Sequence, residues 1–98
     1  MIVRFHPDAE IEFFEAALWY SNQMENLDEE FVDAVDRGIE RIQSNPRQFP
    51  IIFDNFRKLV IKKFPFVIIY TEEDQEILVL AVFHTSKNPK TWNKRISI

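Results

Sequence analysis

The sequence contains no cysteine and only one glycine among its 98 residues. The absence of cysteine excludes disulfide bonds, cysteine-ligated zinc and a thiol nucleophile. The single glycine, Gly38, lies inside a helical pattern. The sequence therefore has no glycine-rich loop of the P-loop or Rossmann type with which to bind phosphate.

Long hydrophobic runs are also missing. No stretch approaches the roughly 18 apolar residues that span a bilayer, and no basic flank with an apolar segment and a small-residue cleavage site marks a secretory signal. We therefore expect neither secretion nor membrane insertion, and a cytoplasmic location.

Hydrophobic and aromatic side chains are abundant: 46% of the residues are hydrophobic and 14% are aromatic, including ten Phe. A chain of this length buries roughly 60 to 70% of its unfolded surface, and this composition can supply that core. Because the length suits one core and not two, we predict a single domain over residues 1–98.

The net charge of −4 conceals an asymmetry between the two halves of the chain. Residues 1–56 carry four Arg and twelve acidic residues, for a net −8, whereas residues 57–98 carry eight Lys or Arg and four acidic residues, for a net +4. Local charge acts on partners through its own field, so the C-terminal half can attract an anionic partner. The alternative is that helices simply collect surface acids and strands collect Lys.

Residues 2–5 form a short apolar segment that ends before Pro7, which favours a strand followed directly by a helix. The first helix is predicted to run from Pro7 to about Asn22. Its core face is expected to consist of Ile11, Phe14 and Leu18, broadened by Phe13, Ala17 and Tyr20.

A second helix is predicted from Asn26, a good N-cap residue with Glu29 three positions later in the manner of a capping box. Asn45 and Pro46 end its pattern, and the two helices should form an antiparallel hairpin. Its acidic residues indicate a solvated face. Its apolar face is predicted to contain Leu27, Phe31, Val35, Ile39 and Ile42.

After a connection over residues 46–53, the pattern changes to that of strands. Residues 58–62, 66–70 and 77–83 are rich in β-branched and aromatic side chains and are joined by short links. We predict an α+β fold in which an N-terminal strand and a two-helix hairpin pack on an antiparallel sheet of about four strands.

Candidate chemistry gathers after the last predicted strand. His84 lies where that strand returns to solvent and can join cations to hold a phosphate; alternatively it only satisfies a backbone group, with Trp92 as a lid on the core. His6 is far from His84 in the sequence, and neither has metal-ligand spacing, so we expect neither a metal nor a cofactor.

Three segments together resemble the RelE/ParE superfamily of bacterial toxins from type II toxin-antitoxin systems. They are Arg57-Lys58-Leu59, residues 64–70 with the sequence FPFVIIY, and residues 81–89 with the sequence AVFHTSKNP, followed by Trp92. The resemblance covers nearly the whole chain. It implies a small intracellular toxin that a cognate antitoxin neutralises.

The superfamily includes ribosome-dependent mRNA endonucleases similar to RelE and ParE-like proteins that poison DNA gyrase. RelE-like nucleases carry an Arg at the position matching Val67 and a C-terminal Tyr, and this sequence has neither. Because fixed cations usually stabilise the anionic transition state, the leading hypothesis is a ParE-like gyrase inhibitor. Its target contacts are predicted to be Arg57, Lys87, Trp92 and Arg95.

Two alternatives remain. In an mRNA endonuclease that cleaves on the ribosome, His84 would be the general acid or base, and Lys58, Lys63 and Lys87 would hold the scissile phosphate. The third hypothesis is a protein of this fold that has lost toxicity and only binds a partner.

Overall fold

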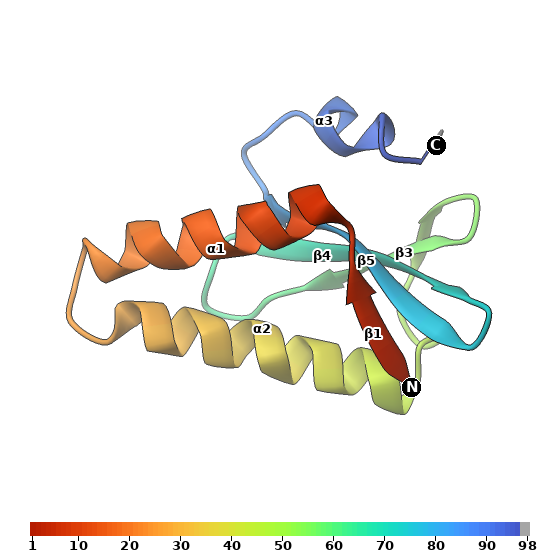
Figure 1. Cartoon of the computed structure of the whole chain (residues 1–98), viewed down its shortest axis with the longest axis horizontal. Coiled ribbons are helices and arrows are strands. Elements are labelled where there is room, and N and C mark those ends of the chain that lie inside the picture. Colours follow the sequence, from red (N-terminus) through yellow and green to blue (C-terminus); the bar gives the residue numbers. More distant parts are fainter. Residues whose placement is uncertain (97–98) are drawn as a thin grey trace.

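A computed structural model describes residues 1–96 and arranges them as a helical hairpin on one face of a sheet and a short helix on the other (Figure 1). The elements in chain order are β1 (Ile2–Phe5), α1 (Pro7–Ser21), α2 (Leu27–Ser44), β2 (Ile51–Phe53), β3 (Phe56–Val60), β4 (Phe66–Glu73), β5 (Glu76–His84) and α3 (Lys90–Asn93).

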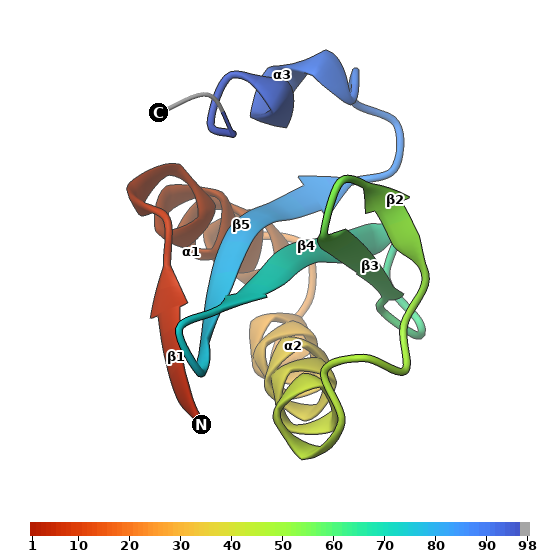
Figure 2. The same ribbon diagram turned by 90° about the vertical axis from the view of Figure 1, so that its right-hand side faces the viewer.

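The sheet within residues 1–96 has five strands in the order β1-β5-β4-β3-β2, so the prediction of about four strands was wrong by one. The extra strand is β2, which lies in the segment expected to be a connection. It joins β3 through a tight turn in which Asp54 has a φ of 48°. The sheet is mixed and not purely antiparallel, because β1 runs parallel to β5 while the other neighbours are antiparallel. Figure 2 shows β1 and β2 at opposite edges.

Helix α2 turns its predicted apolar face to the sheet. Phe31, Val35 and Ile42 are fully buried there. Gly38 lies on the same face, where an added Cβ would come within 3.1 Å of Leu59 and 3.3 Å of Ile61, so glycine allows α2 to approach β3 closely. The predicted capping box is absent: Asn26 precedes the helix in a left-handed conformation without a side-chain cap hydrogen bond.

Helix α1 contradicts part of the prediction. Ile11, Phe14 and Leu18 were expected in the core but are exposed, whereas Ala9 on the opposite side is buried. Tyr20 is buried and Phe13 and Ala17 pack partly against the core, as expected. Because α1 carries apolar residues all round, periodicity alone could not identify its inner face.

Each face of the sheet has its own core. The larger core lies between the helical hairpin and the sheet, where Tyr20, Phe31 and Phe66 form aromatic contacts with ring centroids 5.0 to 6.2 Å apart. The smaller core lies under α3 and consists of Val67, Ile69, Leu80, Ala81, Phe83 and Trp92. Within residues 1–96, no helix is both long and apolar enough to cross a membrane.

Candidate partner-binding groove

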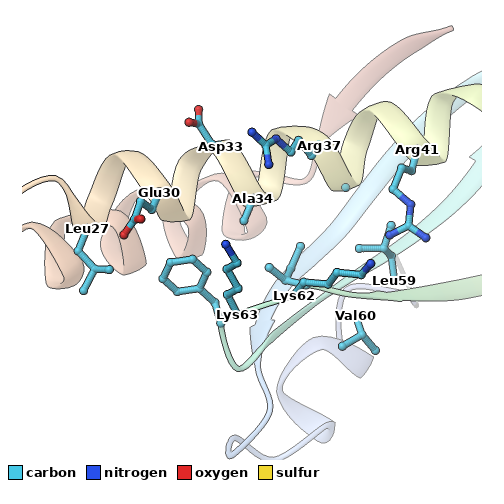
Figure 3. Close-up of a pocket in the computed structure, with 13 residues that line it drawn as sticks. Leu27, Glu30, Asp33, Ala34, Arg37, Arg41, Leu59, Val60, Lys62 and Lys63 are labelled. Atoms are coloured by element: carbon cyan, nitrogen blue, oxygen red, sulfur yellow. The ribbon is translucent and has the colours of Figure 1, made fainter.

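A groove with a volume of about 670 Å³ runs between α2 and β3 and continues along the β3–β4 loop (Figure 3). Its apolar lining comes from both walls, and charged side chains stand along its rim. The lining residues are Leu27, Glu30, Asp33, Ala34, Arg37, Gly38 and Arg41 of α2, and Leu59, Val60, Ile61, Lys62, Lys63 and Phe64 of the β3 side.

The groove lies beside an unpaired stretch of strand. β2 pairs with Phe56 and Arg57 of β3, and the Lys58 N–H donates outward to the Pro50 carbonyl at 3.1 Å. Beyond Lys58, no strand within residues 1–96 pairs with this edge. Alternate residues of a strand direct their backbone groups the same way, so the Val60 N–H and C=O also point away from β4. The groove therefore includes a backbone donor and acceptor suited to strand addition.

Acidic and basic side chains of α2 lie at different ends of the groove. Glu30 and Asp33 stand toward the start of α2, and Arg37 and Arg41 follow one and two turns later. Figure 3 shows Lys62 on the wall opposite Arg41. An extended segment with an apolar side and carboxylates near Arg37 and Arg41 matches this arrangement. Sequence reasoning did not identify the residues that line this groove, although Gly38, a glycine in the middle of an otherwise regular helix, is a sequence signal for it.

Arg95, a predicted target contact, is held inside the protein. Its guanidinium donates to both carboxylate oxygens of Glu12 at 2.9 Å and to the Leu80 carbonyl at 2.9 Å. Only 8% of the Arg95 side chain and 16% of the Glu12 side chain are exposed. The hydrogen bond to Glu12 raises the pKa of Arg95 further, against the opposing effect of its burial. Arg95 therefore links the segment after α3 to α1 and β5.

Trp92 and Lys87 are placed differently from each other. Trp92 is buried in the smaller core, which agrees with the alternative that it is a lid, and it attaches α3 to the sheet. Lys87 is exposed in the turn after β5, where its N–H donates to the His84 carbonyl at 3.0 Å. Of these two predicted contacts, Lys87 is therefore the one whose side chain is exposed to solvent.

Arg57 and Tyr70 hold the loop between α2 and β2. The Arg57 guanidinium donates to the Phe49 carbonyl at 2.7 Å and to the Arg47 carbonyl at 3.1 Å. The Tyr70 hydroxyl donates to the Pro46 carbonyl at 2.7 Å. Burial raises the pKa of Tyr70 to about 12, although the nearby Arg57 charge opposes that rise. These contacts fix the loop that leads into the edge strand.

The predicted catalytic residues do not form one cluster. His84 pairs with Phe66, which belongs to the larger core, and their rings lie 5.1 Å apart. Lys58 pairs with Ile69, which belongs to the smaller core, so Lys58 and His84 lie on opposite faces of the sheet. Lys63 lies at the groove.

The ring of His84 interacts with its own turn. Its Nδ1 accepts from the Ser86 N–H at 3.0 Å and lies 2.7 Å from the Ser86 hydroxyl. Within residues 1–96, no three His, Asp or Glu side chains gather as candidate metal ligands.

Comparison with known proteins agrees with this fold. Residues 3–89 match the family described as the ParE toxin of type II toxin-antitoxin system, parDE. Two relatives named Toxin ParE2, from the CDC 1551 and H37Rv strains of Mycobacterium tuberculosis, are 32% identical over 99 residues, covering 97% of this chain and 91% of theirs.

A solved structure described as the chromosomal ParDE TA system from P. aeruginosa superposes with a TM-score of 0.63 at 16% identity. The match covers 88% of this chain and 97% of that chain, and it shows the shared fold. The resemblance seen in the sequence is thus confirmed. The chain belongs to the ParE family of toxins from type II toxin-antitoxin systems.

Proposed function

We propose that this protein inhibits growth by binding DNA gyrase and not by cleaving RNA. The observation that supports binding is the location of His84 and Lys58 on opposite faces of the sheet. Acid-base cleavage needs a proton-transferring group and fixed cations at the same phosphate. In addition, Val67 is buried in the smaller core at the position where RelE-like nucleases carry an Arg.

The proposed gyrase contacts act in two ways. Lys87 offers its charge directly, together with Lys90 of α3, which is also exposed. Trp92 and Arg95 act by fixing α3 to the body of the protein. Arg57 similarly fixes the loop before β2. The proposed target surface is therefore the basic turn after β5 together with α3, which Trp92 and Arg95 position.

Membership of the ParE family implies an antitoxin partner. We propose that the groove between α2 and β3 receives an extended segment of that antitoxin. The Val60 backbone would pair with the segment as an added strand, and Arg37, Arg41 and Lys62 would bind its carboxylates. Main-chain pairing supplies affinity in this type of recognition, while the side-chain pockets supply specificity.

The test of the target is a gyrase supercoiling assay with the purified protein. We expect inhibition that the antitoxin reverses. A Lys87→Glu/Lys90→Glu variant should inhibit about tenfold less, because charge at an interface governs association. The matched variant Lys62→Glu/Lys63→Glu makes the same charge change at the groove and should inhibit gyrase like the original protein.

Two outcomes would contradict the gyrase proposal. Cleavage of mRNA on ribosomes with gyrase unaffected would favour the endonuclease. Neither activity, with antitoxin binding intact, would favour the non-toxic binding protein.

A further inference from the structure

The turn after β5 holds a serine hydroxyl against a histidine ring. The Ser86 Oγ lies 2.7 Å from the His84 Nδ1, and the same nitrogen accepts from the Ser86 N–H at 3.0 Å. A ring nitrogen that accepts from an N–H carries no proton of its own, so the Ser86 hydroxyl is the donor in the shorter contact. The His84 imidazole is therefore in position to remove the proton of the Ser86 hydroxyl.

The other two serines of residues 1–96 have no such neighbour. The hydroxyls of Ser21 and Ser44 donate to backbone carbonyls of their own helices at 2.6 and 2.9 Å. A carbonyl oxygen does not remove a proton at neutral pH, whereas a neutral imidazole does. A serine becomes a nucleophile when such a base lies within about 2.6 to 3.2 Å of its hydroxyl. The structure therefore gives Ser86 a chemistry that Ser21 and Ser44 lack.

Ser86 is also accessible to another enzyme. Residues 85–90 are all exposed, and Figures 1 and 2 show the chain between β5 and α3 on the outside of the molecule. The groove between α2 and β3 does not include this turn. An exposed nucleophile outside the groove is suited to receive a chemical group that a second enzyme delivers.

The charges around Ser86 favour a phosphoryl group. Lys87 follows directly and Lys90 begins α3, and both are exposed. Neither side chain forms a salt bridge within residues 1–96. Cations beside the acceptor stabilise the negative charge of a phosphoryl group during its transfer. An acyl group, which is neutral once attached, gains nothing comparable from them.

We propose that Ser86 accepts a phosphoryl group from a nucleoside triphosphate, delivered by a protein kinase. The Ser86 oxygen forms a bond to the terminal phosphorus, while the bond from that phosphorus to its bridging oxygen breaks and releases the nucleoside diphosphate. The hydroxyl proton passes to the His84 Nδ1. In the product, this protonated nitrogen and the Ser86 N–H both donate to the new phosphate, and such charge-assisted hydrogen bonds are strong.

Phosphorylation would change the charge of the surface proposed to bind gyrase, and this consequence rests on the proposed function. A phosphoserine carries about −1.5 to −2 charges at pH 7. Lys87 and Lys90 together carry about two positive charges, which the phosphate cancels. The groove proposed for the antitoxin is untouched. The modification would therefore silence the toxin without changing its affinity for the antitoxin.

The first experiment measures the reactivity of Ser86 with diisopropyl fluorophosphate, a reagent that phosphorylates serine and releases fluoride. Peptide mass spectrometry should find Ser86 modified at least tenfold faster than Ser21 or Ser44. His84→Gln should slow the reaction at Ser86 at least tenfold, because a general base contributes on the order of 10² to 10⁴-fold. Thr85→Val, the neighbouring control, should leave the rate unchanged.

The second experiment compares two proteins in which phosphoserine is incorporated during translation. Phosphoserine in place of Ser86 should weaken inhibition of gyrase supercoiling at least tenfold, because it removes the net charge of the proposed target surface. Phosphoserine in place of Ser21 adds the same charge at the end of α1 and should inhibit like the original protein. Calorimetry should give both the original protein and the Ser86-modified protein the same affinity for the antitoxin.

The outcomes separate this inference from the proposed function. Protein isolated from the cells that produce it should contain phosphoserine at position 86, and its absence would overturn the inference. Equal reactivity of the three serines, or no effect of His84→Gln, would overturn the role of His84. If phosphoserine at position 86 leaves gyrase inhibition unchanged, the silencing fails while the gyrase proposal stands. If the original protein does not inhibit gyrase, that proposal fails, whereas the reactivity and phosphorylation of Ser86 still decide whether it is an acceptor.

Discussion

At both edges of the sheet, a short outer strand covers only part of its longer neighbour. β1 pairs with β5 from Glu76 to Val79, and side chains continue that edge beyond it: the Val82 N–H donates to Glu12 at 3.1 Å, and Arg95 donates to the Leu80 carbonyl. At the other edge, β2 ends early and β3 continues unpaired beside the groove. One edge is closed by a buried ion pair and the other is open.

The difference shows which edge is built for stability and which is available to a partner. Unpaired strand edges invite pairing with another chain, so proteins usually cover them. At the β5 edge the cover comes from within the chain and fixes the segment after α3. At the β3 edge Val60 is 57% exposed between basic side chains, and within residues 1–96 no strand pairs with the side of Val60 that faces away from β4.

The largest effect is expected at the closed edge. Arg95→Ala should lower the free energy of unfolding by about 3 kcal/mol, because the Glu12 carboxylate remains buried without its cation. Urea denaturation measures the loss. Arg4→Ala is the control, because Arg4 pairs with Glu76 at 3.0 Å in a largely exposed position on β1. It should cost less than about 1 kcal/mol. Equal losses in the two variants would mean that the buried pair does not close the edge.

At the open edge, Val60→Pro should weaken antitoxin binding by about 10- to 100-fold. This is the expected cost of leaving the antitoxin group that faces the Val60 N–H without its hydrogen bond. Proline removes the outward N–H, which takes no part in the β3–β4 ladder, so the protein should still fold. Val60→Thr keeps both the N–H and the branched shape and should bind normally. Calorimetry with the antitoxin gives the comparison. Equal affinity of the proline and threonine variants would exclude strand addition at Val60.

The loop that leads into β2 should show a smaller effect. Tyr70→Phe removes the hydrogen bond to the Pro46 carbonyl and should cost about 1 kcal/mol at pH 9, measured by urea denaturation. The pKa of Tyr70 is raised from 10.0 to about 12 in the folded protein. Its stabilising contribution is therefore complete below pH 10 and is lost as the pH rises from 10 toward 12.

The stability of the original protein should therefore fall more steeply at alkaline pH than the stability of the Tyr70→Phe variant. Between pH 9 and pH 11 the original protein should lose about 1 kcal/mol more stability than Tyr70→Phe, so that their stabilities converge. Tyr20 has a raised pKa in both proteins and cancels from the comparison. Equal losses of stability in the two proteins over this pH range would mean that ionisation of Tyr70 does not cause the difference.

The parts of the fold that could be predicted from the sequence are those with one clear periodicity. Helix α2 has a single apolar face, and Phe31, Val35 and Ile42 are buried as predicted. β4 and β5 are nearly continuous apolar runs, and both are central in the sheet. The family could also be predicted, because residues 57–59, 64–70 and 81–89 each resemble a segment of that family.

The parts that could not be predicted depend on contacts between distant residues or on exposed apolar side chains. Glu12 and Arg95 are 83 residues apart, and no local pattern pairs them. The three residues of β2 are all exposed, so they show no alternation that marks a strand. The site residues were predicted to be surface contacts because of their residue types. In the structure, the side chains of Trp92 and Arg95 are buried and hold α3 and the segment after it to the rest of the protein.

The smallest effect is expected for His84→Gln, which tests whether the end of β5 beyond the closed edge carries chemistry. If the protein acts by docking on gyrase, growth inhibition should change less than about threefold, because Gln can replace the hydrogen bond from the Ser86 N–H. A general acid or base contributes on the order of 10² to 10⁴-fold, so a nuclease would lose most of its activity. Toxicity is measured by induced expression without the antitoxin, with Lys87→Glu/Lys90→Glu as the variant that should relieve it. Loss of toxicity in His84→Gln, at an unchanged melting temperature, would reject gyrase docking in favour of RNA cleavage.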